Sequence, residues 1–172
     1  LVAFSNGIGS LCVQLSFFFF YFWVTTVIFT SPHLVTVEER IRINGRPIEP
    51  NDFERYLVRV REASEMEPEC SPTYFESTFL SAMLVFSEAG VQRGIVETGM
   101  GGRLDATRLV DADLCFLTSV SMEHSQFLGE TLREIAFEKA SIHRPGVPII
   151  AIEHEDDGVR EIIEEIAGPD LK

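Results

Sequence analysis

Short apolar runs alternate with segments of helical spacing along most of this chain, and this alternation restricts the fold more than any other feature of the sequence. The strand-like runs are residues 94–96, 114–120 and 147–152, and the helical segments are residues 73–89, 131–141 and 158–167. Strands that alternate with helices are typical of an α/β fold. We therefore expect a mostly parallel sheet with helices on both faces.

Residues that precede these runs contain two local sequence patterns, one typical of a hairpin and one typical of a helix. Asn44-Gly45, inside residues 41–48, is the turn pair that hairpins prefer, so a short hairpin is predicted there. Pro50 then precedes apolar residues at helical spacing, which predicts an amphipathic helix.

Residues 11–29 carry no charge, and no Asp, Glu, Lys or Arg occurs before Glu38. A segment of this length could just cross a bilayer. The alternative is a buried helix followed by a buried parallel strand at residues 24–29, because such strands are also continuously apolar. A glycine-rich turn precedes the segment and the polar sequence TSPH follows it. We prefer the buried interpretation, since both flanking motifs then have a function.

The charge balance argues against one class of partner. The 172 residues include 27 Asp and Glu but only 14 Lys and Arg, giving a formal net charge of -13. Binding to a nucleic-acid backbone needs clustered basic residues, so no nucleic-acid partner is expected. Of the three cysteines, Cys12 and Cys115 lie in apolar runs, and the set has no metal-ligand spacing. This usage suits a reducing compartment, and we expect a cytoplasmic protein.

Chemically distinctive residues gather where the predicted strands end, which is where open α/β sheets bind ligands. SNGIGS (residues 5–10) has the setting of a phosphate-binding loop. Glu97 follows a strand and leads into a glycine-rich loop, whose three glycines would let the backbone approach a ligand. His124 ends the next strand and Lys139 lies in the following helix. Each has a simpler explanation: chain reversal, solvation, or pairing of Lys139 with Glu134 or Glu138.

The order of these motifs resembles the folylpolyglutamate synthase and dihydrofolate synthase family, in the Mur ligase group. The resemblance lies in TSPHL and ERIRING (residues 30–34 and 39–45), ETGMGGRLDAT (97–107), HSQFLG (124–129) and EKA (138–140). It extends over about residues 2–152. It implies that residues 1–172 form a truncated, P-loop-like ATP-binding domain, and that the C-terminal glutamate-binding domain of the family is absent.

The resemblance also implies a reaction and its cofactors, ATP and Mg²⁺. ATP would phosphorylate a carboxylate of dihydropteroate or folate, and the amine of L-glutamate would attack the acyl phosphate. By motif position, Asn6, Gly7, Gly9 and Ser10 would bind the nucleotide, Ser10, Glu97 and His124 would bind metal, and Ser31 and His33 would contact the pterin-containing substrate. Lys139 matches the lysine that is carbamylated in the family, and with His124 it would be catalytic.

The match fails at several positions. The family loop GTNGKGS is FSNGIGS here, so Ile8 replaces the phosphate-binding lysine and Phe4 the first glycine. Glu123 stands where the family usually has Asp, and Arg108 where it usually has Asn. The sequence therefore predicts an impaired ligase, with little activity from this polypeptide alone. The alternatives are a non-catalytic pseudoenzyme fragment and a membrane-anchored protein that uses residues 11–29. A eukaryotic source would allow a mitochondrial location.

Overall fold

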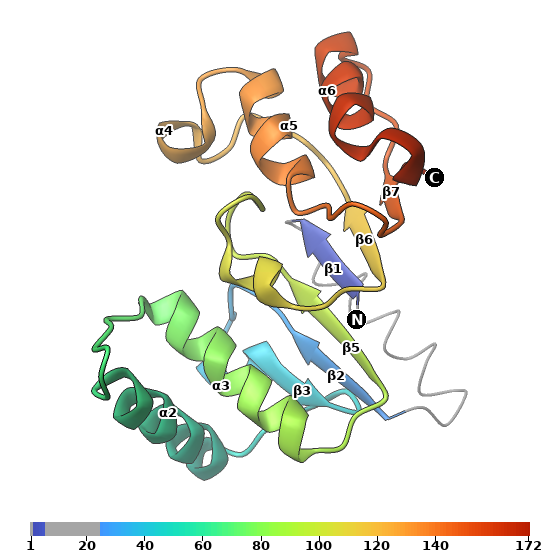
Figure 1. Ribbon diagram of the computed structural model, residues 1–172. Helices are drawn as coiled ribbons and strands as arrows, with labels where there is room; N and C mark the ends of the chain where they lie inside the picture. The colour runs from blue at the N-terminus through green and yellow to red at the C-terminus, as the bar shows by residue number, and fades with distance from the viewer. Residues whose placement is uncertain (1, 6–24) are drawn as a thin grey trace. The chain divides into compact units, whose positions relative to one another are not determined.

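The computed structural model describes residues 2–5 and 25–172 (Figure 1). The chain forms two compact units. Unit 1 contains Leu1–Gly9 and Val96–Lys172, and unit 2 contains Ser10–Ile95. Strand β5 (Arg93–Glu97) carries the chain from unit 2 into unit 1.

Unit 1 contains a run of parallel strands. β1 (Val2–Ser5) pairs in parallel with β6 (Leu114–Leu117), and β6 pairs in parallel with β7 (Ile149–Ala151). All three strands therefore end at the same edge. Two helices connect or follow the strands: α5 (Leu132–Ala140) between β6 and β7, and α6 (Asp157–Ala167) after β7. A helical crossover of this kind is what joins neighbouring parallel strands.

The helices of unit 1 begin at side-chain caps. Thr131 and Glu134 form a reciprocal capping box at the start of α5, and the Asp156 carboxylate accepts a hydrogen bond from the Val159 amide at the start of α6. The remaining elements of unit 1 are short: η2 (Ala106–Leu109), α4 (Ser125–Leu128) and η3 (Gly168–Asp170).

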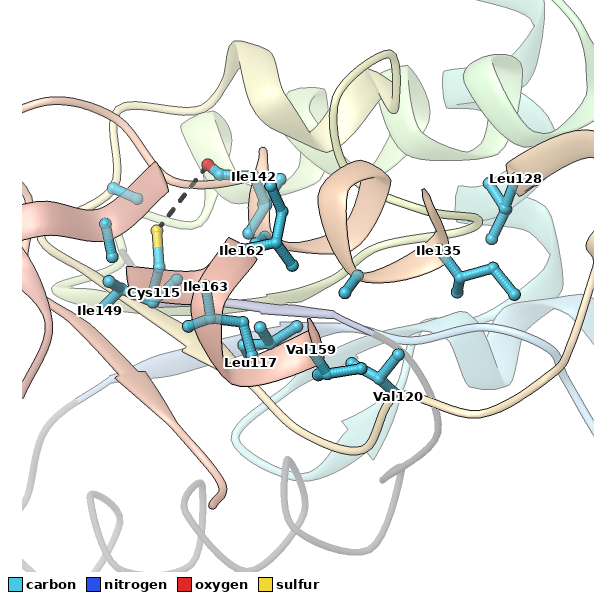
Figure 2. Close-up of a cluster of buried hydrophobic side chains, with 14 residues drawn as sticks. Cys115, Leu117, Val120, Leu128, Ile135, Ile142, Ile149, Val159, Ile162 and Ile163 are labelled. Atoms are coloured by element: carbon cyan, nitrogen blue, oxygen red, sulfur yellow. Dashed lines mark hydrogen bonds between the residues drawn. The ribbon is translucent and has the colours of Figure 1, made fainter. Parts of the chain in front are cut away.

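The core of unit 1 lies between these strands and helices (Figure 2). Cys115, Leu117 and Ile149 from the strands meet Ile135 from α5 and Val159 from α6, with Cys115 fully buried. Burial raises the pKa of the Cys115 thiol, so this cysteine is a small buried hydrophobe, as the sequence predicted.

Unit 2 contains antiparallel pairs among β2 (Thr26–Phe29), β3 (Ile41–Ile43) and β4 (Arg46–Pro47). Asn44 and Gly45 both have positive φ (49° and 79°), as a two-residue hairpin turn requires, so the predicted hairpin is confirmed. The Asn44 side chain also accepts a hydrogen bond from the Thr26 amide (3.0 Å), which fixes the turn beside β2.

Two helices follow in unit 2, α2 (Pro50–Ser64) and α3 (Tyr74–Glu88), where the sequence predicted helices. Thr73 and Glu76 form a capping box at the start of α3. Phe29 of β2 is fully buried and contacts Phe75 and Phe79 of α3 edge to face, with ring centroids 5.7 and 5.6 Å apart. These aromatic contacts fix α3 on the strand.

The expected α/β class is confirmed, but the expected strand directions hold only in part. Residues 24–29 were expected to include a parallel strand, whereas β2 is antiparallel to β3. The connection between them contains one 3-10 turn, η1 (Val37–Arg40), and no α-helical crossover that a parallel pair would need. No helix in residues 25–172 is long and apolar enough to cross a membrane. Residues 11–24 of the uncharged segment lie outside the described part, and β2 occupies most of its remainder.

Candidate active site

The nucleotide-loop residues predicted from the sequence lie outside the described part of the chain. They are Asn6, Gly7, Ile8, Gly9 and Ser10. β1 ends just before them at Ser5, which pairs with Leu117 at the end of β6. Ser5, the residue before the predicted loop, therefore lies at the edge where the parallel strands of unit 1 end.

Glu97 is a buried carboxylate at the end of β5. Only 2% of its surface is exposed, and Ile95 and Val96 before it are fully buried. A carboxylate in such a position is stable only with hydrogen bonds or a cation. Magnesium in nucleotide sites typically takes one or two protein carboxylates together with phosphates and water. Glu97 suits that role, even though residues 2–5 and 25–172 contain no group of three or more His, Cys, Asp or Glu that could hold a metal.

The loop after Glu97 is organised by one side chain, Asp105. Its Oδ2 accepts hydrogen bonds from the amides of Gly99 (2.9 Å) and Met100 (3.0 Å). Its Oδ1 accepts from the amide (2.9 Å) and the hydroxyl (2.6 Å) of Thr107. One carboxylate thus ties the beginning of the loop to its end.

Two glycines of this loop lie close against other parts of the protein. A Cβ on Gly102 would lie 2.8 Å from the Lys139 carbonyl oxygen and 2.9 Å from Ile142 Cβ, and a Cβ on Gly101 would lie 2.9 Å from Leu128 Cδ2. Gly101 also has φ +66°, a conformation that favours glycine. Their missing side chains let the loop approach α5 and α4 of the protein itself; the approach of the backbone to a ligand stays a prediction.

Lys139 is fully buried and ion-paired. Its Nζ donates a hydrogen bond to the Ser119 carbonyl oxygen (3.3 Å) and contacts the Glu123 carboxylate. The predicted alternative partners are engaged elsewhere: Glu138 pairs with Arg103 (2.9 Å), and Glu134 caps α5. A fully buried ammonium opposite a partly exposed carboxylate is uncommon for a structural lysine and marks a candidate functional group.

His124 directly follows Glu123, in the segment between β6 and α4. It has φ 50° and precedes α4, so the backbone turns sharply there. The imidazole is exposed, and no hydrogen bond or ion pair joins it to any other residue among those described. His124 can therefore accept a ligand without losing an internal contact.

The predicted substrate residues, Ser31 and His33, belong to unit 2 and are half-buried. His33 Nδ1 accepts a hydrogen bond from Arg40 Nε (3.0 Å). Because Arg40 can only donate, Nδ1 is the acceptor in this contact, which favours the tautomer with its proton on Nε2. Arg40 is itself buried, and its guanidinium lies over the Tyr74 ring, 5.3 Å from the centroid.

Glu39 anchors the loop that carries His33. Its two oxygens accept hydrogen bonds from the amides of Leu34 (3.1 Å) and Thr36 (3.2 Å), and the bond from Leu34 is the main cause that lowers the pKa of Glu39. Leu34 itself is 92% exposed. An ionised Glu39 therefore keeps the His33 loop folded while apolar side chains face solvent.

Sequence reasoning missed the supporting residues Asp105, Arg40 and Glu39. All three lie inside the quoted motifs GGRLDAT and ERIRING, but periodicity cannot reveal which backbone amides a side chain will bind. Arg108, one of the departures from the family motif, donates from Nε to the Ser141 carbonyl oxygen at the end of α5 (3.1 Å). It therefore strengthens the attachment of the loop.

Comparison with known proteins decides the relationship. No family model matches the chain. The dihydrofolate synthase/folylpolyglutamate synthase of Haemophilus influenzae is 38% identical over 146 residues, which cover 85% of this chain and 32% of that protein. E. coli FolC in complex with DHPP and ADP has the same fold, with a TM-score of 0.89 at 34% identity, over 97% of this chain and 40% of FolC. The chain is a homologue of these synthases.

A second solved structure extends the comparison. A bifunctional folylpolyglutamate synthase/dihydrofolate synthase with Mn, AMPPNP and L-glutamate bound matches 99% of this chain and 42% of its own, with a TM-score of 0.87 and 31% identity. The chain spans 26% to 38% of the length of the curated synthases that it matches. The family resemblance predicted from the motifs is confirmed.

Proposed function

We propose that this chain is part of an ATP-dependent ligase that joins L-glutamate to dihydropteroate or to a folate. The observation that carries the proposal is the similarity to E. coli FolC, whose structure with DHPP and ADP matches 97% of this chain. The similar synthase that holds Mn, AMPPNP and L-glutamate supports a nucleotide, a divalent metal and glutamate as ligands.

The proposed reaction has two steps. A carboxylate oxygen of the pterin-containing substrate attacks the γ-phosphorus of ATP, which gives an acyl phosphate and releases ADP. The amine nitrogen of glutamate then attacks the acyl carbon, loses a proton and expels inorganic phosphate. Bound Mg²⁺ would offset the negative charge on the phosphates. Glu97, with Ser10, would hold one ion through oxygen, and His124 would help to hold a second.

Lys139 is the candidate for carbamylation. In that step the ammonium would first lose a proton, and the neutral amine would then add to CO₂ and release a second proton, so a cation would become an anion. Glu123, its present partner, would then face a like charge. The ion pair and the carbamate are therefore mutually exclusive, and carbamylation requires the Glu123 carboxylate to turn toward a metal or toward solvent.

Ser31 and His33 are proposed to contact the pterin-containing substrate. His33 accepts from Arg40 at Nδ1, so its free group is the Nε2–H donor. That donor suits a carbonyl oxygen or a ring nitrogen of a heterocycle. We propose a cytoplasmic or a mitochondrial location. The similar synthases from hamster and human are named as mitochondrial.

Calorimetric titration of the purified chain with AMPPNP, with and without Mg²⁺, tests the proposal. Mg²⁺-dependent binding is expected, and Glu97→Gln should remove the dependence on Mg²⁺ while keeping the shape of the side chain. Glu153→Gln, which makes the same change at an exposed position of unit 1, is the matched control. Mg²⁺-dependent binding that is equal in all three proteins would contradict the assignment of Glu97.

A non-catalytic fragment is the second candidate, favoured by Ile8 and Phe4 at loop positions where the family has lysine and glycine. Ile8→Lys separates the two. A gain of AMPPNP affinity on restoring the lysine would show that only the charge was lost. No binding before or after the substitution, in a folded sample, would favour the non-catalytic fragment. Recovery of the expressed chain in the membrane fraction would instead favour the membrane-anchored alternative.

A further inference from the structure

We infer that Asp105 is a positioning residue, which sets the Glu97 carboxylate by fixing the loop that follows it. The four hydrogen bonds that Asp105 accepts come from Gly99, Met100 and Thr107 and not from Glu97. Its effect would pass through the backbone of residues 98–100. The inference rests on the proposed function, because the metal that Glu97 would bind belongs to that proposal.

The Asp105 carboxylate uses both oxygens, each toward a different end of the loop. Oδ2 holds the amides of Gly99 and Met100, which are two and three residues after Glu97. Oδ1 holds the amide and hydroxyl of Thr107, which is itself fully buried. Hydrogen bonds to an ionised acceptor are about twice as strong as neutral ones, so these four contacts fix the exit of β5 firmly.

The other side of the loop is attached to α5. The Arg103 amide donates to the Glu138 carbonyl oxygen (3.0 Å), and Arg103 Nε pairs with the Glu138 carboxylate (2.9 Å). Gly102 packs against the same helix, close to the carbonyl of Lys139. The helix that carries Lys139 therefore holds the middle of the loop, and Asp105 connects that anchored loop back to Glu97.

The hydrogen bonds of the Gly99 and Met100 amides also indicate which anion the loop binds. Consecutive backbone amides such as those of Gly99 and Met100 can form an anion-binding nest. Here the anion is the protein's own Asp105 carboxylate, so both amides are occupied. The loop acts as a brace between Glu97 and α5, and the phosphates must find their donors elsewhere.

Asp105→Asn is the decisive substitution. It keeps the shape of the side chain but replaces one acceptor oxygen with an NH₂ group, which would face donors. Loss of an outer group that orients a metal ligand typically weakens metal affinity by about 10- to 100-fold. Asp111→Asn is the matched control, because it makes the same chemical change at an exposed position of the same unit.

Two measurements are made on wild type and both variants. Amide hydrogen exchange reports on Gly99 and Met100, and electron paramagnetic resonance reports on Mn²⁺ binding in the presence of AMPPNP. We expect Asp105→Asn to speed exchange at both amides by about tenfold or more. It should also weaken Mn²⁺ affinity by about 10- to 100-fold. Exchange elsewhere in unit 1 should match that of Asp111→Asn.

The outcomes separate this inference from the proposed function. Unchanged exchange at Gly99 and Met100 would overturn the inference at its first step. Faster exchange with wild-type Mn²⁺ affinity would show that Asp105 holds the loop without positioning Glu97. A wild-type protein that binds no Mn²⁺ with AMPPNP would overturn the proposed function, and with it the metal part of this inference.

A second variant covers the case in which Asp105→Asn does not fold. Thr107→Val is similar in shape and removes only the hydroxyl contact to Asp105 Oδ1. It should shift exchange and Mn²⁺ affinity in the same direction by a smaller factor. Values equal to those of wild type would overturn the inference.

Discussion

Gly102→Ala should destabilise unit 1, although the substitution adds a single methyl group. The new Cβ would lie 2.8 Å from the Lys139 carbonyl oxygen and 3.0 Å from that of Glu138, both backbone atoms of α5, and 2.9 Å from Ile142 Cβ. Ordinary van der Waals contact begins at 3.4 Å, so α5 or the loop must retreat by about 0.6 Å. Overpacking a dense interior in this way costs about 1–3 kcal/mol.

Urea unfolding followed by circular dichroism measures this loss. Gly158→Ala is the control: it lies in α6 of the same unit, its Cβ would meet one side-chain atom, Asp156 Oδ1 at 3.2 Å, and no backbone atom, and alanine favours helix by up to about 1 kcal/mol over glycine. We expect Gly158→Ala to be neutral or stabilising. If Gly102→Ala unfolds at the same urea concentration as wild type, the glycine is not required for packing on α5, and a ligand-binding role for this glycine becomes the better explanation.

Three further predictions concern single contacts. Glu123→Leu should cost about 1–3 kcal/mol in urea unfolding, because it leaves the fully buried Lys139 ammonium unpaired, whereas Lys139→Met should cost less, since Glu123 is 40% exposed and can be solvated. Hydrogen bonds from the Thr131 side chain and backbone lower the pKa of Glu134, so its contribution exists above the unfolded pKa of 4.5 and disappears as pH falls through the lower folded pKa. Glu134→Gln should therefore be less stable than wild type at pH 7 and equal to it once both forms are neutral in acid. Arg40→Met should remove the preference of His33 for the Nε2–H tautomer, which ¹⁵N nuclear magnetic resonance of the imidazole reports directly.

The elements of this fold could be predicted where local chemistry determines them. The Asn44-Gly45 pair indicated a hairpin because few residues adopt two successive positive φ angles, and both angles are indeed positive. Helices α3 and α5 were predicted from apolar residues at helical spacing, and capping boxes are found at the start of both. Strand direction was less predictable, since β2 could be recognised as a buried strand from its apolar run but its antiparallel pairing depends on how the chain returns.

The partners of the candidate site residues could not be predicted for a related reason. Pairing with Glu134 or Glu138 on its own helix was the simpler alternative for Lys139, but adjacent helical residues do not face each other, which excludes Glu138 on geometry alone. Its partner, Glu123, comes from the segment after β6, 16 residues earlier in the chain. Only the crossover from β6 to α5 brings the two together, and no local pattern contains that information.

The contacts around the loop that follows Glu97 support our proposal that Ile8 limits nucleotide binding. Phosphates need positive charge close by. Arg103 is paired with Glu138, Arg108 donates to a carbonyl oxygen at the end of α5, and Lys139 is buried against Glu123. Each of these cations already has an anionic or polar partner, and moving one to a phosphate would break that contact. A lysine at position 8 would add a cation without removing one from these three contacts. We therefore expect Ile8→Lys to raise nucleotide affinity more than an added lysine at an exposed position of unit 1, such as Asp111→Lys.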